Sequence, residues 1–202
     1  MIQNVVFDMG GVMIRCNFDK SLMEHVPMEA DRALVRREVY GSVEWCQMDR
    51  GTLNKEDAVA SLCGRTPERI HPFIRNILAA WHKSADPMPG MAALVGRLKD
   101  AGYGVYLLSN TTRDYRTFLP LVPGIDRFDG VFASADWKLL KPDPAIFRTF
   151  LAEFGLTAES CIFVDDMALN VESAIYSGFH GYVFRGDAEA LETALVAEGL
   201  TF

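Results

Sequence analysis

Acidic and polar side chains occur at three places where an apolar run of the sequence ends. Asp8 ends the first run, Ser109 and Asn110 end the second, and Asp165 and Asp166 end the third. Ligands of an open α/β sheet bind at the carboxyl ends of its parallel strands, so we expect these five residues at one edge of a sheet. The pattern therefore predicts a single site assembled from distant parts of the chain.

The residue types at this predicted site favour phosphoryl transfer. Three carboxylates at one edge repel each other and need a cation, and oxygen ligands without His or Cys suit Mg²⁺. Lys141 follows a fourth apolar run by a short loop and would add a positive charge. The Ser109 hydroxyl and nearby backbone N–H groups can bind an oxyanion. Asp8 would then be a nucleophile that forms an aspartyl-phosphate.

The apolar runs also predict the sheet that would hold these residues. From residue 87 onward, continuous apolar segments alternate with amphipathic helical segments, which is typical of buried parallel strands joined by helices. The expected strands lie at residues 5–7, 105–108, 131–133, 161–164 and 182–184. We therefore expect an α/β fold with a doubly wound parallel sheet.

Residues 15–85 have a different pattern, with little strand signal and several amphipathic helices. One helix is expected over residues 54–64. The apolar face of another consists of Ile70, Phe73, Ile74, Ile77, Leu78 and Trp81. Thr66 and Pro67 would form its cap and first turn, with Pro72 in its second turn. We interpret this segment as an all-helical insertion.

Composition and charge exclude several other classes of function. The chain has 202 residues and is 50% hydrophobic, enough for the core of one domain with a modest insertion. Its formal net charge of -7 disfavours nucleic-acid binding, which needs a basic surface. Its four cysteines do not cluster as zinc ligands, and no apolar run is long enough for a membrane span. We expect a cytoplasmic protein with free thiols that acts on a small molecule.

Four pieces of the sequence resemble the motifs of the haloacid dehalogenase-like hydrolases and occur in the same order. They are Phe7-Asp8-Met9-Gly10-Gly11-Val12, Leu107-Leu108-Ser109-Asn110, Lys141-Pro142-Asp143 and Phe163-Val164-Asp165-Asp166. Each piece is weak evidence alone, but four in this order, with these gaps and this insertion, are specific. The resemblance spans the whole chain. It implies a Rossmann-like core made of residues 1–14 and 86–202, interrupted by a helical cap at residues 15–85.

The resemblance also implies roles around a metal ion. Asp8 would be both the nucleophile and a Mg²⁺ ligand, and the backbone carbonyl of Gly10 would be a second ligand. Asp166 would bind the metal directly, while Asp165 would lie farther out or alternate with it. Asn170, one helical turn after Asp166, would support these ligands from behind, although it could equally be a helix cap.

The remaining motif residues would act on the group that is transferred. Ser109 and Asn110 would hold the phosphoryl group, and Lys141 would orient Asp8 and neutralise charge. Each has a plainer interpretation when considered singly: Ser109 as a helix cap and Lys141 as a solvated surface lysine. It is their occurrence together that favours the catalytic interpretation.

Gly10 departs from the pattern of most phosphatases in this superfamily. The motif of those enzymes is Asp-x-Asp, and its second Asp is the general acid and base. General acid–base catalysis contributes roughly 10²–10⁴-fold to the rate. Val12 and the triplet Ser109-Asn110-Thr111 place the chain nearest a subgroup that reads Asp-x-Gly-x-Val and resembles hexose-1-phosphate phosphatases. Without the acid, leaving groups that are already acidic would be favoured. The main hypothesis is thus a Mg²⁺-dependent phosphatase for a small phosphorylated metabolite, with a sugar-1-phosphate as one candidate.

Two other functions remain open at this point. A 2-haloacid dehalogenase would use Asp8 to attack carbon, and such enzymes also lack the second Asp. The doubled carboxylate at Asp165 and Asp166 is poorly suited to an anionic substrate without a metal, which disfavours that reaction. A catalytically weak relative that binds a phosphorylated ligand is supported by Gly10, but the retention of Asp8 and Lys141 argues against it.

Overall fold

The centre of the molecule is a five-stranded parallel sheet. The computed structural model describes all residues from 1 to 202. The strands are β1 (Asn4–Phe7), β4 (Gly104–Ser109), β5 (Gly130–Ala133), β6 (Cys161–Asp165) and β7 (His180–Val183). Their order is β5-β4-β1-β6-β7, and every neighbouring pair is parallel. The predicted Rossmann-like, doubly wound α/β fold is therefore confirmed.

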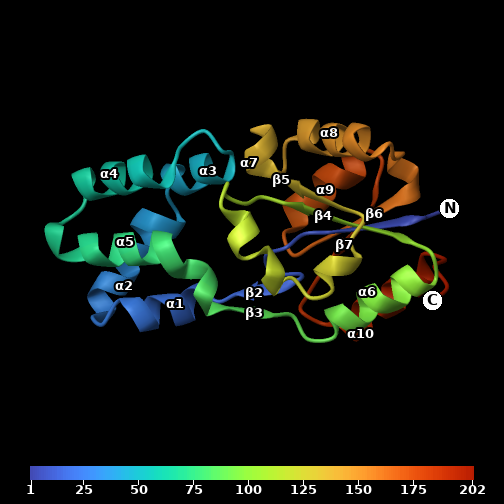
Figure 1. Cartoon of the computed structure of the whole chain (residues 1–202), viewed down its shortest axis with the longest axis horizontal. Coiled ribbons are helices and arrows are strands. Elements are labelled where there is room, and N and C mark those ends of the chain that lie inside the picture. The colour runs from blue at the N-terminus through green and yellow to red at the C-terminus, as the bar shows by residue number, and fades with distance from the viewer.

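Helices cover both faces of this sheet (Figure 1). The helices of the core are α6 (Met91–Asp100), α7 (Ser134–Trp137), α8 (Pro144–Phe154), α9 (Ala168–Tyr176) and α10 (Ala188–Ala197). Successive strand residues point to opposite faces. Accordingly Val5 and Phe7 pack in one buried cluster with α6 and α10, whereas Val6 packs in another with α8 and α9.

A separate group of helices lies at one end of the sheet (Figure 1), and we call residues 17–84 the helical block. It contains α1 (Phe18–His25), α2 (Glu29–Val35), a π-helical turn (Arg36–Tyr40), α3 (Val43–Asp49), α4 (Lys55–Arg65) and α5 (His71–Ala80). These helices enclose a hydrophobic core of their own, formed by residues from Leu22 to Leu78. None of the helices in the protein has the length and apolar character needed to cross a membrane.

Short 3₁₀ turns complete the chain. They are Glu68–Ile70, Trp81–Ser84, Tyr115–Thr117, Leu119–Leu121, Ile125–Arg127 and Ala158–Ser160. The first of them differs from the sequence-based expectation of one helix from residue 66 onward. Pro72 lacks the N–H that would bond to a carbonyl four residues earlier, so the α-helix begins at His71 with Pro72 in its first turn.

Two short strands that the sequence did not suggest connect the helical block to the core. β2 (Ile14–Cys16) and β3 (Ala85–Pro87) pair antiparallel, with Ile14 opposite Pro87 and Cys16 opposite Ala85. The boundaries expected after residues 14 and 85 thus fall inside one two-stranded ribbon. Three-residue strands carry too little alternation to be recognised from the sequence.

Candidate active site

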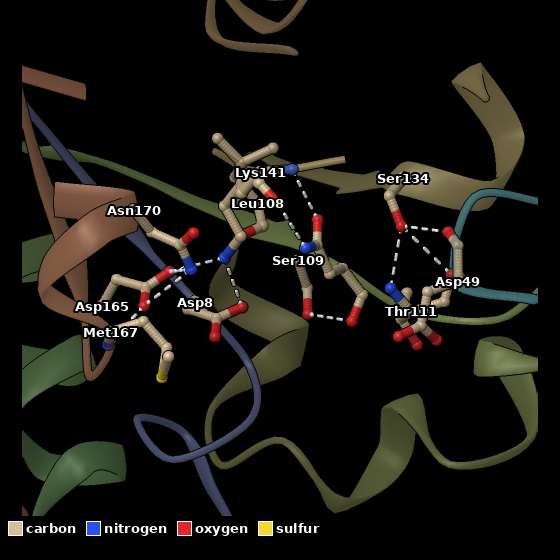
Figure 2. Close-up of polar contacts among 11 residues, drawn as sticks. Asp8, Asp49, Leu108, Ser109, Thr111, Ser134, Lys141, Asp165, Met167 and Asn170 are labelled. Atoms are coloured by element: carbon tan, nitrogen blue, oxygen red, sulfur yellow. Dashed lines mark hydrogen bonds and ion pairs between the residues drawn. The ribbon is translucent and has the colours of Figure 1, made fainter. Parts of the chain in front are cut away.

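Three neighbouring strands bring the predicted residues together at one edge of the sheet. Asp8 directly follows β1, while Ser109 and Asp165 are the last residues of β4 and β6, the two strands that flank β1. Lys141 reaches the same place from the loop between α7 and α8 (Figure 2). The sheet order therefore explains why residues far apart in the sequence share a site.

Lys141 lies at the centre of this cluster and contacts two of its carboxylates. Its Nζ lies 2.8 Å from Asp8 Oδ1 and 2.7 Å from Asp165 Oδ2, and it donates a hydrogen bond to the carbonyl of Leu108 at 3.1 Å. Its side chain is only 1% exposed, so Lys141 is not a solvated surface lysine. A buried ammonium must be paired to be tolerated, and here two carboxylates pair with it.

Asp165 uses both of its oxygens within the protein. Oδ1 accepts hydrogen bonds from the backbone N–H of Met167 at 2.8 Å and from Asn170 Nδ2 at 3.1 Å, and Oδ2 accepts from Asn170 Nδ2 at 3.0 Å as well as from Lys141. Asn170 therefore contacts Asp165 rather than capping α9 (Figure 2). Asp165 is fully buried, so it is held in one orientation.

Charge repulsion and burial shift the pKa values of this cluster. Burial raises the pKa of Asp8 to about 6, and the charge of Asp165 adds to the rise while Lys141 opposes it. Burial alone would lower the pKa of Lys141, but the two carboxylates outweigh it, so this pKa is raised and the ammonium stays charged. Burial, with the charge of Asp165, also raises the pKa of Asp166. Additional positive charge nearby would therefore be needed to keep Asp8 fully ionised at neutral pH.

The carboxylates fit a divalent cation. Asp8, Asp165 and Asp166 place oxygens within 4.8 Å of one another. Three negative charges and the positive charge of Lys141 leave a formal charge of minus two. Asp8 Oδ1 is buried, and its partner in the protein is the Lys141 ammonium, 2.8 Å away. A set of hard oxygen donors with this charge suits Mg²⁺.

Gly11 allows the loop after β1 to pass close to Asp166. Its φ is +75°, and a Cβ at this position would lie 2.3 Å from Asp166 Oδ2. Gly10 is different, since a Cβ there would meet nothing nearer than Cys16 Sγ at 3.5 Å. Only the second glycine is therefore demanded by backbone conformation and space.

The side chain of Asn110 binds the backbone of the loop that carries Lys141. Its Nδ2 donates to the carbonyl of Lys141 at 3.0 Å, and its Oδ1 accepts from the N–H of Lys141 at 2.9 Å. The side-chain amide thus fixes the loop that carries Lys141. Only the backbone of Asn110 is then available to contact a ligand. Thr111, two residues after Ser109, has a buried hydroxyl without a partner, so it joins Ser109 as a possible oxyanion contact.

A cavity of about 500 Å³ opens over this cluster. The loop ends of the sheet form its floor with Asp8, Met9, Gly10, Gly11, Ser109, Asn110, Thr111 and Asp166. The other lining residues are Arg15, Cys16, Phe18, Trp45, Asp49, Trp81 and Met88. The cavity therefore has a polar, acidic floor, and its walls combine three aromatic side chains with Met88 and the polar residues Arg15, Cys16 and Asp49.

Comparison with known proteins agrees with this geometry. The family model of the haloacid dehalogenase-like hydrolases matches residues 2–178. The chain belongs to this family. The sesquiterpene phosphatase astK of Aspergillus oryzae is 28% identical over 180 residues, which are 87% of this chain and 86% of that protein. The D-ribitol-5-phosphate phosphatase of Bacteroides thetaiotaomicron is 25% identical over 193 residues, 90% of this chain and 91% of that protein.

Solved structures share the fold of this hydrolase. A HAD family enzyme of Bacteroides thetaiotaomicron, in complex with magnesium and inorganic phosphate, has a TM-score of 0.73 at 21% identity and covers 95% of this chain and 99% of that chain. The L-2-haloacid dehalogenase of Xanthobacter autotrophicus has a TM-score of 0.68 at 22% identity and covers 99% of this chain and 84% of that chain. At such identities the likeness establishes the fold alone.

Sequence reasoning missed the residues of this hydrolase that reach the cavity from the helical block. Phe18, Trp45 and Asp49 belong to helices that the sequence did not resolve individually. Trp81 packs against the core of the helical block and also lines the cavity, where its ring centroid lies 5.9 Å from that of Trp45. Their sequence carries no motif, so the tertiary structure alone reveals them. Trp137, by contrast, stacks on Phe132 at 4.9 Å and serves packing.

Proposed function

We propose that this hydrolase is a Mg²⁺-dependent phosphatase that cleaves a small phosphate ester through an aspartyl-phosphate on Asp8. The observation that carries the proposal is the cluster of three carboxylates around the buried Lys141, with a formal charge of minus two, at the floor of a cavity. A carboxylate nucleophile beside a cation site is suited to attack on phosphorus.

Each residue of the cluster has a part in this reaction. Asp8 attacks phosphorus, and the ion pair with Lys141 holds its carboxylate in place. Asp166, Asp8 and the backbone carbonyl of Gly10 would hold Mg²⁺, which, when bound, neutralises charge on the transferring phosphoryl group. Asp165 keeps Lys141 charged and oriented, and Asn170 holds Asp165.

Residues of the second strand would bind the phosphoryl oxygens. Ser109 and Thr111 offer hydroxyls at the cavity floor, and the backbone of Asn110 lies between them. Donors that are already in position cost no reorganisation during the reaction, which is why such sites stabilise developing charge. This assignment is consistent with the fixed orientation of Asn110 against Lys141.

Two whole-length relatives support a phosphatase, since one is a sesquiterpene phosphatase and the other a D-ribitol-5-phosphate phosphatase. A protein of the same fold binds magnesium and inorganic phosphate. A dehalogenase is less well supported, because a site with a formal charge of minus two would repel a haloacid carboxylate. A phosphate-binding protein without catalysis would have no need of the ion-paired Asp8.

The walls of the cavity favour an organic group with an apolar face. Phe18, Trp45, Trp81 and Met88 are the apolar side chains among the lining residues outside the acidic floor. With the phosphate on the floor, the rest of the substrate would pack against these side chains, which suits an aryl or prenyl group and also the C–H face of a sugar. The helical block would act as a cap that excludes water during the first chemical step.

The test is a phosphate-release screen of the purified protein with and without Mg²⁺. Suitable substrates are phenyl phosphate, geranyl monophosphate, glucose-1-phosphate and glucose-6-phosphate, with 2-chloropropionate as the dehalogenase substrate. We expect phosphate release that needs Mg²⁺ and stops with Asp8→Asn. Halide release from 2-chloropropionate in excess chelator, without phosphate release from any ester, would overturn the proposal.

A further inference from the structure

The proposed reaction needs a proton donor that the loop after β1 does not supply. When Asp8 attacks phosphorus, the departing oxygen must take up a proton, and the later attack of water must lose one. Gly10 stands where most phosphatases of the family carry the acid, and it has no side chain. The donor must therefore come from another part of the cavity wall.

Among the titratable side chains that line the cavity, only one is a suitable proton donor. Besides the proposed metal ligands Asp8 and Asp166, they are Arg15, Cys16 and Asp49. Arginine stays protonated in proteins. Burial, with the charge of Asp8, raises the pKa of the Cys16 thiol to about 12, so this thiol is a poor acid at neutral pH. Asp49 is the remaining group.

Asp49 is the last residue of α3 and is held against the core (Figure 2). Its backbone carbonyl accepts a hydrogen bond from Ser134 Oγ at 2.6 Å, and Ser134 Oγ in turn accepts from the N–H of Thr111 at 2.8 Å. The end of α3 is thereby tied to the same strand end that carries Ser109. Asp49 also lines the cavity above the acidic floor, and its carboxyl group is close enough to Asp8 to be affected by its charge.

Gly51 permits this close docking. Its φ is +72°, and a Cβ would lie 2.2 Å from the carbonyl oxygen of Ala135. Arg113 donates a hydrogen bond to the carbonyl of Gly51, and Lys55 forms an ion pair with Asp114 at 2.5 Å. The segment after α3 is thus fastened to the core at several points, so Asp49 has a defined position relative to Asp8.

The surroundings raise the pKa of Asp49 toward neutral pH. Burial raises its pKa to about 7, and the charges of Asp8 and Asp114 add to the rise, while hydrogen bonding by the Trp45 side chain opposes it. The other charged groups that line the same cavity are Arg15 on β2 and Asp166 after β6. A carboxyl with this pKa can donate a proton in one step and accept one in the next.

We propose that Asp49, supplied by the helical block, is the general acid and base that replaces the missing side chain at Gly10; this rests on the proposed phosphatase function. In the first step a carboxylate oxygen of Asp8 bonds to phosphorus, the bond from phosphorus to the leaving oxygen breaks, and Asp49 gives its proton to that oxygen. In the second step the Asp49 carboxylate takes a proton from water, whose oxygen bonds to phosphorus as the bond to Asp8 breaks. Phosphate and alcohol are released, and both carboxyl groups regain their starting states.

The test is the dependence of rate on the leaving group in Asp49→Asn. The substrates are a series of aryl phosphates with increasingly acidic phenols, together with an alkyl phosphate, at saturating Mg²⁺. The wild type should respond weakly to leaving-group acidity. Asp49→Asn should lose about 10²- to 10⁴-fold in kcat/KM on the alkyl phosphate and far less on the most acidic phenols. With the latter, a burst of phenol should appear because the aspartyl-phosphate accumulates.

Two further variants complete the design. Asp57→Asn removes an exposed carboxylate in the first turn of α4 and should behave as wild type. Gly10→Asp combined with Asp49→Asn should recover the alkyl phosphate activity, because space for a side chain exists at Gly10. The comparison of substrates is made within each variant, so a lowered active fraction does not affect it.

The outcomes separate this proposal from the one on which it depends. An Asp49→Asn variant that keeps the weak leaving-group dependence of the wild type, whether fully active or uniformly slower, would overturn the role of Asp49. Turnover that persists in Asp8→Asn would instead overturn the proposed function. A steep dependence in Asp49→Asn, with a phenol burst and rescue by Gly10→Asp, would support both.

Discussion

Gly11→Ala should damage the proposed metal site far more than it damages the fold. The alanine would be forced into a left-handed backbone conformation, at φ +75°, which costs about 1–2 kcal/mol for a residue other than glycine. Its Cβ would also lie 2.3 Å from Asp166 Oδ2, where ordinary contact begins at 3.4 Å. Asp166 must therefore retreat by about 1 Å, the difference between these two distances.

The retreat of Asp166 sets the expected size of the effect. Mg²⁺ requires near-ideal octahedral geometry with short bonds to oxygen, so a ligand displaced this far no longer binds well. We expect the Mg²⁺ concentration for half-maximal activity to rise about 10- to 100-fold, as when support for a metal ligand is lost. The assay is a Mg²⁺ titration of phosphate release, combined with urea unfolding in chelator.

Gly102→Ala is the matched control. Gly102 also has a left-handed φ, +88°, but a Cβ there meets nothing within 4 Å, and it lies outside the cavity. Both variants should lose similar stability, whereas only Gly11→Ala should need more Mg²⁺. Equal Mg²⁺ requirements in the two variants would refute the assignment of Asp166 as a ligand packed against Gly11.

Three other outcomes follow from the same cluster. Asp8→Asn should abolish turnover and leave the fold intact, and near-normal phosphate release by the variant would disprove its role as the nucleophile. Asp165→Ala should lower the free energy of unfolding by about 3–5 kcal/mol because it removes a buried partner of Lys141, whereas Asp166→Ala should mainly raise the Mg²⁺ requirement; urea unfolding and Mg²⁺ titration distinguish the two. In chelator, the raised pKa of Asp8, about 6 instead of 3.8, favours the folded state below pH 4 and loses this contribution as the pH rises through 6. The stability difference between wild type and Asp8→Asn should therefore change across this range, and an unchanged difference would contradict the raised pKa.

The predicted fold and the meeting of the motif residues depended on local signals. The runs before Asp8, Ser109 and Asp165 are continuously apolar, as expected for strands buried on both faces. Parallel strands that are neighbours in a sheet end at the same edge, so the convergence of these side chains followed once the strands were recognised. The start of the helix expected over residues 54–64 is likewise a local property, because the Asn54 side chain accepts a hydrogen bond from the backbone N–H of Asp57.

Other features depend on contacts between residues distant in the sequence, and no local sequence pattern predicts them. The ribbon of β2 and β3 consists of two three-residue strands with 68 residues between them, in which Cys16 pairs with Ala85 and Ile14 with Pro87. The amide of Asn110 could have faced a ligand, and only the position of the Lys141 loop assigns it to that backbone. Asn170 could have capped its helix, and only the buried Asp165 draws its side chain away.

The sequence by itself thus determined the sheet, the identity of the acidic cluster and the absence of a side chain at Gly10, because apolar periodicity and residue chemistry are local properties. The tertiary structure decided what faces that cluster. Asp49 reaches the cavity because Ser134 binds the end of α3 and Gly51 lets the next segment touch Ala135. The docking of one set of packed helices on another arises from many weak contacts between residues distant in sequence, and no single one of them forms a recognisable motif.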